Sequence, residues 1–344
     1  MADAGQTGGT NHQPPRLRVA LFNDTSGQRH HGCTAVMDSI ERLFGAAGIG
    51  IGWRHQVRVN AADDPGTAGA IAGHDAVVVN GEGTLHSSRN KARGLASLGP
   101  MARAAGKRAW LINATLQDND DAIVADLAAF DHIWVRESAS AAWARAQGLP
   151  VTVLPDLSLC QPLDAPDGPT GGSGTMVIDS VLPAANLTLY RMARAAGGLL
   201  WTMEHDASGR RQVLHPHPAS DSGLPRRLWV KGRVFLREPV GSTCNLAGFA
   251  AFLLQHQAMV TGRFHAVCLA LLLRLPFHAL PSNTWKIQAT LADAGLNPAR
   301  MLAPEAGLPA ALPFSPDELA AITRYIAGAR TGAQAMAERI LTGY

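Results

Sequence analysis

Cysteine is scarce in this chain and is not arranged for chemistry. The 344 residues contain four cysteines, at positions 33, 160, 244 and 268, and none belongs to a CxxC motif or to a spacing that suits zinc. Reduced thiols in the cytosol fit this pattern best, so we expect a cytoplasmic protein. Because no other cluster of metal ligands is evident, we expect no metal site and an activity that needs no divalent ion.

Long apolar runs are also missing. The two longest, residues 246–254 and 266–273, are too short to span a bilayer, so no transmembrane helix is predicted. The first 16 residues lack the features of a signal peptide, and we interpret residues 1–16 as a disordered tail. Residues 318–341 resemble a helix with three arginines and an apolar face. Such a helix usually covers a core, and the alternative is peripheral contact with the inner face of the cytoplasmic membrane.

An excess of one charge is nearly absent. The chain has 30 Lys and Arg residues against 27 Asp and Glu, a net charge of +3, and its basic residues are scattered singly. Nucleic-acid binding requires a basic patch, so we expect no nucleic-acid partner. The small positive excess is compatible with a small anionic substrate or an anionic lipid surface.

The length and the alternation of patterns predict two α/β domains. A chain of 344 residues exceeds the usual size of one hydrophobic core. Short β-type runs alternate with Ala-rich helical stretches, which is typical of parallel sheets. In the first half these runs cover residues 17–22, 76–79, 108–112, 132–135 and 151–154, and in the second half residues 175–178, 258–260 and 277–280.

The domain boundary is expected in a segment rich in proline and glycine. Residues 161–174 contain three Pro and four Gly and almost no large apolar residue, so we interpret them as a linker. This places an N-terminal Rossmann-like domain at 17–160, a C-terminal one at 175–310 and a helical segment at 311–344. Residues 207–227 show no periodicity and are predicted to form a long loop.

Polar residues directly after predicted strands are the first candidates for chemistry, because ligands of open parallel sheets bind outside the carboxyl ends of the strands. Asn23 and Asp24 follow the first strand, before a helix whose free amides would face an anion; the alternative is an ordinary N-cap with solvated histidines, His31 among them. Glu82 and His86 follow the second predicted strand, residues 76–79. Glu82, between two glycines, would accept a proton from a hydroxyl nucleophile, or would simply cap the next helix.

Three further clusters contain cationic residues. Arg136 follows a strand and offers a planar fork for a carboxylate or phosphate, unless it forms a surface pair with Glu137, while Asp156 is interpreted as part of a structural turn. Arg263 and His265 begin the most apolar helix of the chain. They must face a cleft or a partner, because an unpaired buried charge costs several kcal/mol. Ser282, Asn283, Thr284 and Lys286 follow the last predicted strand and are expected to bind a phosphate at the start of a helix. The alternative is that they form an ordinary N-cap.

Together these clusters resemble the polysaccharide pyruvyl transferase family, from the first strand to about residue 296. The most specific part is Thr-Gly-Arg-Phe-His-Ala at residues 261–266, followed by Leu-Pro at 275–276 and Ser-Asn-Thr-Trp-Lys at 282–286. The resemblance implies a glycosyltransferase-B-like fold, with two Rossmann-like domains facing each other across a cleft. It also implies transfer of a pyruvyl group from phosphoenolpyruvate to a sugar hydroxyl, forming a ketal on a bacterial surface polysaccharide or its lipid-linked precursor.

The resemblance also suggests roles for the candidate residues. His265 would be the general acid and Glu82 the base, with Arg263 as a third catalytic residue. The small anionic donor would be a co-substrate, with no cofactor, and would bind Arg136, Arg263, Ser282, Asn283, Thr284 and Lys286. The glycan or lipid-linked oligosaccharide acceptor would contact Asn23, Asp24, His31 and His86.

Departures from the family pattern leave two alternatives. Many members have three glycines where this chain has Asn-Gly-Glu-Gly at residues 80–83, so the donor or the acceptor can differ. The first alternative is a glycosyltransferase that uses a nucleotide-activated sugar, for example a CMP-linked Kdo or sialic acid. The His-Pro pair at His215, in the irregular loop, is a weak match to that class. The second alternative is a non-catalytic glycan-binding protein of the same fold.

Overall fold

The computed structural model describes residues 15–163, 172–205, 211–213 and 237–343. The predicted tail at 1–16 lies outside the described residues except for its last two. Most of the linker at 161–174, most of the loop at 207–227 and the pair at His215 also lie outside them. Within that loop the chain forms strand β9 (Arg211–Val213), which pairs antiparallel with β10 (Arg237–Pro239), so the prediction of an unbroken loop is wrong at these residues.

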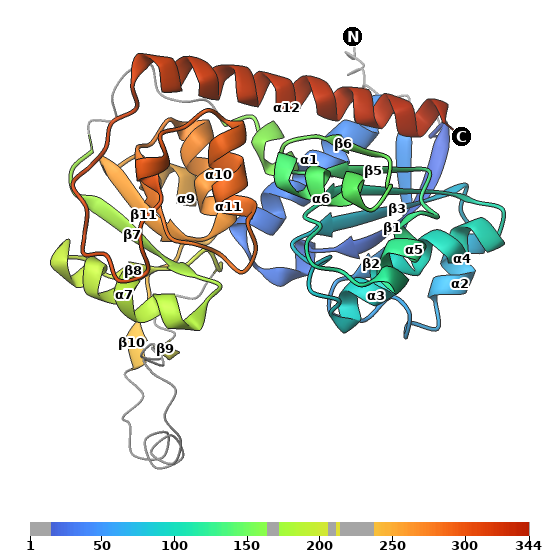
Figure 1. Ribbon diagram of the computed structural model, residues 1–344, viewed down its shortest axis with the longest axis horizontal. Coiled ribbons are helices and arrows are strands. Elements are labelled where there is room, and N and C mark those ends of the chain that lie inside the picture. Colours follow the sequence, from blue (N-terminus) through green and yellow to red (C-terminus); the bar gives the residue numbers. More distant parts are fainter. Residues whose placement is uncertain (1–14, 164–171, 206–210, 214–236, 344) are drawn as a thin grey trace, which may run out of the picture.

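A six-stranded sheet, parallel in every pair, forms the N lobe (Figure 1). Its strand order is β2-β1-β3-β4-β5-β6. The strands are β1 (Leu17–Asp24), β2 (Ile49–Gln56), β3 (Ala76–Glu82), β4 (Arg108–Ala114), β5 (His132–Val135) and β6 (Val151–Val153). Strand β3 is buried at every residue, as expected for a strand covered by helices on both faces. Sequence analysis missed β2, because its two glycines and its polar end hide the β pattern.

Six helices accompany this sheet. They are α1 (His31–Ala47), α2 (Thr67–Ala72), α3 (Asn90–Ala96), α4 (Leu98–Ala104), α5 (Asp121–Leu127) and α6 (Ser138–Ala146). The 3-10 helix η2 (Leu157–Cys160) follows β6. Helix α1 begins at His31 instead of near residue 33, and this shift decides which of its first side chains face inward.

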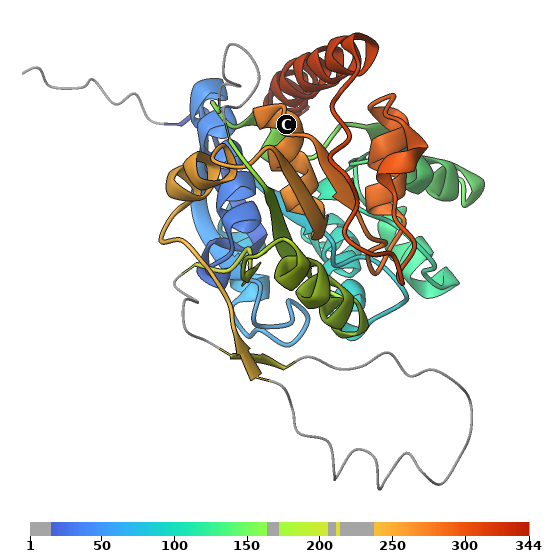
Figure 2. The same ribbon diagram turned by 90° about the vertical axis from the view of Figure 1, so that its left-hand side faces the viewer.

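A four-stranded parallel sheet forms the C lobe, in the order β12-β11-β7-β8. Its strands are β7 (Thr175–Ser180), β8 (Leu200–Trp201), β11 (Ala258–Gly262) and β12 (Phe277–Ala279). Its helices are α7 (Pro183–Ala195), α9 (Leu246–Leu253), α10 (Phe264–Leu273) and α11 (Lys286–Asp293). Figure 2 views the molecule from this side. Helix α10 is buried at nearly every residue, which explains its uniformly apolar sequence.

The last helix, α12 (Pro316–Thr342), joins the two lobes (Figure 1). Its first half packs Ile322 and Ile326 into the core of the C lobe, and its second half packs Met336 and Ile340 into the core of the N lobe. Sequence analysis gave membrane contact as one alternative for the apolar face of this helix. In the structure that face packs against the cores of both lobes. No helix in the described part of the chain is both long and apolar enough to cross a bilayer.

Both sheets reverse their strand order once, and the two reversals position the site. In the N lobe the reversal lies between β1 and β3, and in the C lobe between β7 and β11. Open parallel sheets bind ligands at such switch points, outside the carboxyl ends of the strands. We therefore expect the site among the residues that follow these four strands.

Candidate active site

A cavity of about 240 Å³ lies between the residues that follow the two switch points. We call it the interlobe cavity. The N lobe contributes Thr25, Gln28, His30, Cys33, Val57, Glu82, Gly83, Thr84 and Arg136, and the C lobe contributes Val181, Arg263, Phe264, His265, Asn283 and Lys286. Six of these fifteen residues, Glu82, Arg136, Arg263, His265, Asn283 and Lys286, are candidates from the sequence.

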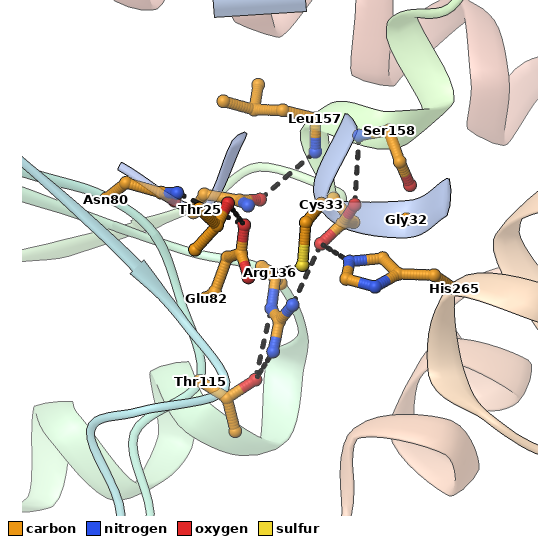
Figure 3. A network of polar contacts seen from close by, with 12 residues as sticks. Thr25, Gly32, Cys33, Asn80, Glu82, Thr115, Arg136, Leu157, Ser158 and His265 are labelled. Atoms are coloured by element: carbon orange, nitrogen blue, oxygen red, sulfur yellow. Dashed lines mark hydrogen bonds and ion pairs between the residues drawn. The ribbon is translucent and has the colours of Figure 1, made fainter. Parts of the chain in front are cut away.

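Glu82 ends β3 and is held across the N-lobe switch point. Its carboxylate accepts a hydrogen bond from Thr25 Oγ1 at 2.8 Å, just after β1, and one from Asn80 Nδ2 at 3.1 Å (Figure 3). Its backbone φ of 38° lies in the left-handed region, which residues other than glycine rarely adopt. The surrounding sheet holds this strained residue in place, so Glu82 enters the cavity with a fixed orientation.

Arg136 is buried within the same wall of the cavity and is tied to Asp156. Its Nη1 donates to Asp156 Oδ2 at 2.9 Å, its Nε donates to Thr115 Oγ1 at 3.1 Å, and its guanidinium stacks 4.6 Å from the centre of the Phe264 ring. Although burial alone would raise the pKa of Asp156, His265 and Arg136 outweigh it and hold that pKa well below its usual range. The interpretation of Asp156 as a structural turn was thus incomplete, because its carboxylate is the counter-ion of the site.

His265 meets the same carboxylate from the opposite lobe. Its Nε2 lies 3.7 Å from Asp156 Oδ2, and its side chain is 11 % exposed (Figure 3). The ring packs directly against the start of α1, where a β carbon on Gly32 would lie 2.2 Å from the imidazole. The ring of His265 can occupy this position only because residue 32 is a glycine.

Arg263 forms the equivalent anchor in the C lobe. It is the N-cap residue of α10, and its guanidinium donates to both carboxylate oxygens of Asp179, at 2.7 and 2.5 Å. Asp179 belongs to β7, so this pair spans the C-lobe switch point just as Glu82 and Thr25 span the other. The sequence argument that Arg263 must find a partner or a cleft is confirmed in both respects.

Lys286 is the third cation of the cavity, and it has no carboxylate partner among the ion pairs of the described residues. Its Nζ donates to Asn283 Oδ1 at 2.7 Å, and Asn283 Nδ2 in turn lies 3.2 Å from His86 Nε2. Burial, followed by the charge of Arg136, lowers the pKa of Lys286 to about 7. A β carbon on Gly83 would lie 3.5 Å from Lys286 Nζ and 3.8 Å from Arg136 Nη2. Gly83 thus leaves open the space that both cations face.

The charge of Lys286 predicts that anion binding weakens as the pH rises. An amine with a pKa near 7 is mostly charged at about pH 6.5 and mostly neutral at about pH 8.5, so the affinity for sulfate should fall about tenfold or more over this range. Sulfate is a suitable probe because its own charge stays constant. Calorimetry at constant ionic strength measures the effect.

The variant Lys286→Met should bind sulfate weakly and with a nearly flat pH profile. Lys91→Met is the matched control, because Lys91 donates to the carbonyl of Val57 and does not line the cavity. This control should keep the pH profile of the wild type. Equal sulfate affinity of the wild type at both pH values would contradict the role of Lys286.

Six predicted site residues do not line the cavity, and a structural contact explains most of them. Asn23 donates to the carbonyl of Asn80 at 2.6 Å, and Asp24 pairs with Arg54 at 3.2 Å. His31 is buried against Phe249, with ring centres 4.5 Å apart. The hydroxyl of Ser282 donates to Asn283, and Thr284 is buried with no hydrogen-bond partner for its hydroxyl among the described residues.

His86 also lies behind the cavity wall instead of in it. Burial, and then the charge of Arg89, lowers its pKa to about 4, so it supports Asn283 as a neutral ring. The four residues expected to contact an acceptor, Asn23, Asp24, His31 and His86, are therefore all engaged in packing or supporting contacts. None of the four lines the interlobe cavity, and their assignment to acceptor binding stays a prediction.

Sequence reasoning missed several residues of the site. Thr25, His30 and Cys33 lie in the polar segment after the first strand but received no role. Asp179 directly follows the strand predicted at 175–178, and the structure extends that strand, β7, through it. The available signal was position, since each follows or ends a strand at a switch point. Among the described residues, no three His, Cys, Asp or Glu side chains are placed to hold a metal ion together.

No protein-family model matches the chain, and no curated protein matches its sequence. Among solved structures, the UDP-GlcNAc 2-epimerase of Methanocaldococcus jannaschii, in complex with UDP-GlcNAc and UDP, is 10 % identical with a TM-score of 0.51. The match covers 95 % of this chain and 100 % of that one. The UDP-GlcNAc 2-epimerase of Neisseria meningitidis, bound to UDP-GlcNAc, is also 10 % identical over 95 % and 100 %, with a TM-score of 0.49.

An α-glucosyltransferase in complex with UDP-glucose and DNA containing an abasic site is 8 % identical, over 94 % of this chain and 95 % of that one, with a TM-score of 0.43. None of these three proteins is named as a pyruvyl transferase. At such identities the likeness concerns the fold alone. The chain therefore has the expected α/β fold, two Rossmann-like domains facing each other across a cleft in the glycosyltransferase-B-like arrangement.

Proposed function

We propose that this chain is a sugar-modifying transferase that binds an anionic activated donor in the interlobe cavity and passes a group to a sugar hydroxyl. One observation supports this most. Three cationic side chains, Arg136, Arg263 and Lys286, line one cavity, and among the described residues that line it Glu82 is the one carboxylate. The carboxylates of Asp156 and Asp179 orient the two arginines from behind and do not line the cavity themselves. An anion with two negative groups fits such a wall.

The fold comparison favours a nucleotide-activated sugar as the donor. The Methanocaldococcus jannaschii epimerase that shares the fold was solved with UDP-GlcNAc and UDP. A diphosphate would place its charges against the same three cations, and Glu82 would take the proton of the attacking hydroxyl. A CMP-linked sugar belongs to the same class of donor.

The size of the cavity favours the smaller donor, phosphoenolpyruvate. Its volume of about 240 Å³ is below the roughly 300–1,000 Å³ of typical ligand pockets. Phosphoenolpyruvate carries a carboxylate and a phosphate, which supply two anionic groups in a small volume. This donor is also the one that the resemblance to pyruvyl transferases implies, with a glycan or lipid-linked oligosaccharide as acceptor.

With either donor, His265 and Glu82 are the residues that we propose to act at the reacting atoms, because both line the cavity. Asp156 orients the His265 ring from one side and Gly32 limits it from the other, so the ring has one position. With phosphoenolpyruvate, His265 would protonate the methylene carbon, and the sugar hydroxyl would add to the oxocarbenium-like carbon while Glu82 takes its proton. Phosphate then leaves with the electron pair of its bond to that carbon and takes the proton held by Glu82. A second hydroxyl of the same sugar adds to the carbon to complete the ketal and returns its proton to His265.

Donor-dependent thermal stabilisation tests the proposal and separates the donors. Phosphoenolpyruvate, UDP-GlcNAc and CMP are added separately, and a ligand at about 100 times its Kd should stabilise the folded chain by about 2.7 kcal/mol. A rise with phosphoenolpyruvate alone supports pyruvyl transfer, and a rise with a nucleotide alone supports glycosyl transfer. No rise with any of them contradicts a transferase and favours the glycan-binding alternative.

Replacing His265 by alanine should separate binding from chemistry. The stabilising donor should still raise the melting temperature, because the cations remain, while turnover falls about a hundredfold or more through loss of a general acid. His74→Gln is the control, since His74 bonds the carbonyl of Ala70 away from the cavity and should leave turnover unchanged. Full turnover of His265→Ala would remove His265 from the mechanism.

A further inference from the structure

His30 lines the interlobe cavity but has no role in the scheme above. It is the N-cap residue of α1, and its Nδ1 accepts a hydrogen bond from the backbone N–H of Gly32 at 3.1 Å. Its ring centre lies 5.8 Å from that of His265, nearly edge-on. Gly32 therefore lies against both rings, as a backbone donor to one and as the packing surface of the other.

The hydrogen bond to Gly32 determines where His30 carries its proton. A ring nitrogen that accepts a hydrogen bond has no hydrogen, so the neutral ring must carry its proton on Nε2. A second proton on Nδ1 would break the N-cap and add positive charge at the positive end of the α1 dipole. Burial lowers the pKa of His30 well below its usual range, and the nearby His265 and Arg263 act in the same direction. The ring is therefore a neutral donor near pH 7.

Contacts between the lobes hold His30 at the edge of the cavity. Its backbone forms an isolated antiparallel bridge with Glu204, and the two flanking bonds run from His31 N to Met203 O at 2.9 Å and from His205 N to Arg29 O at 2.7 Å. The N-cap of α1 belongs to the N lobe, whereas its bridge partner belongs to the C lobe. The ring is thus fixed by both sides of the cavity it lines.

We propose that His30 is a second catalytic residue, a permanently neutral imidazole whose Nε2–H donates a hydrogen bond to the leaving phosphate oxygen of the donor. This inference rests on the proposed function. In both donor classes the bond from carbon to phosphate oxygen breaks and its electron pair stays on that oxygen. His30 stabilises this charge without transferring a proton, so the reaction balances without it, while proton transfer belongs to His265 and Glu82. Two neighbouring histidines thus have different tasks because their surroundings differ.

Two substitutions separate the cap from the donor. Asparagine at position 30 places an amide oxygen where Nδ1 stands, so it keeps the N-cap and loses the donor at Nε2. Glutamine places an amide nitrogen near the position of Nε2, so it keeps a donor and loses the cap. The probes are inorganic phosphate and UDP, the leaving groups of the two donor classes, with binding measured by calorimetry.

We expect His30→Asn to melt near the wild-type temperature and to bind the leaving group about tenfold or more weakly, as loss of a hydrogen bond to a charged group would give. His30→Gln should melt lower and retain binding within about threefold. If His30 has only a structural role, the opposite order of affinities is expected. His30→Asn would then bind the leaving group like the wild type, and His30→Gln would bind it more weakly. Wild-type affinity of His30→Asn, beside a wild type that binds either probe, would overturn the role of His30 and leave the proposed function intact.

A measurement on the ring itself is independent of any ligand. Nitrogen-15 spectra of the histidine side chains, with His30 assigned by its loss in His30→Asn, should show the Nε2–H form without titration between about pH 5.5 and about pH 8. A ring that carries its proton on Nδ1, or that titrates in this range, overturns the inference. Failure of the wild type to bind either probe or any donor would instead overturn the proposed function, and with it this role.

Discussion

Replacing Gly32 by alanine is expected to lower turnover about a hundredfold or more without unfolding the protein. A β carbon at this position would lie 2.2 Å from His265, closer than two such atoms approach in proteins. The imidazole must therefore move away from the start of α1, and a displacement of about 1 Å at a reacting group costs on the order of a hundredfold in rate. The donor-dependent rise in melting temperature should survive in part, because Arg136 and Lys286 stay in place.

Gly45→Ala is the matched control for this variant. Gly45 lies in the same helix, is exposed, and has no atom within 4 Å of the position of an added β carbon. Alanine there should leave turnover unchanged and stabilise the chain by about 0.5–1 kcal/mol, the usual difference between glycine and alanine within a helix. Normal turnover of Gly32→Ala would show that the position of His265 beside α1 is not required.

The largest loss of stability is expected for Asp156→Asn. Arg136 and Asp156 are each 1 % exposed, so the substitution leaves a buried guanidinium without its counter-ion. Breaking such a pair usually costs about 3–5 kcal/mol. The 3-10 cap should persist, because the asparagine oxygen can still accept the N–H of Ser158. Urea denaturation measures the change in the free energy of unfolding.

Asp120→Asn is the control for charge removal at an N-cap. Asp120 caps α5 and pairs with Arg93, but both side chains are over 40 % exposed, so the loss should be much smaller than for Asp156→Asn. The double variant Arg136→Met, Asp156→Asn should recover much of the stability, since no buried charge remains unpaired, yet it should not recover donor binding. A loss for Asp156→Asn no larger than for Asp120→Asn would contradict the buried pair.

Most strands and the main cationic groups could be predicted from the sequence, because they depend on local patterns. The strands at residues 132–135 and 175–178 read as apolar runs between helical stretches, and the structure has strands there. Arg263 and His265 could be identified because charges at the start of an entirely apolar helix require a partner or a cleft. These inferences need only neighbours along the chain.

The choice among neighbouring polar residues could not be predicted. Adjacent residues at the start of a helix point about 100° apart, so a start at His31 instead of residue 33 turns His30 to the cavity and His31 to Phe249. Sequence analysis selected His31, which is buried in packing. It likewise took Asp156 as a turn, because its partners Arg136 and His265 come from other parts of the chain.

The sequence by itself determined the fold class and a set of cationic residues at strand ends, since hydrophobic periodicity and the cost of burying charge act over a few residues. Only the tertiary structure decided which of them meet. Strand order places β1 beside β3 and β7 beside β11, and the lobes bring both switch points to one cavity. Contacts between residues far apart in the chain depend on how the sheets are ordered and packed, which no local pattern encodes.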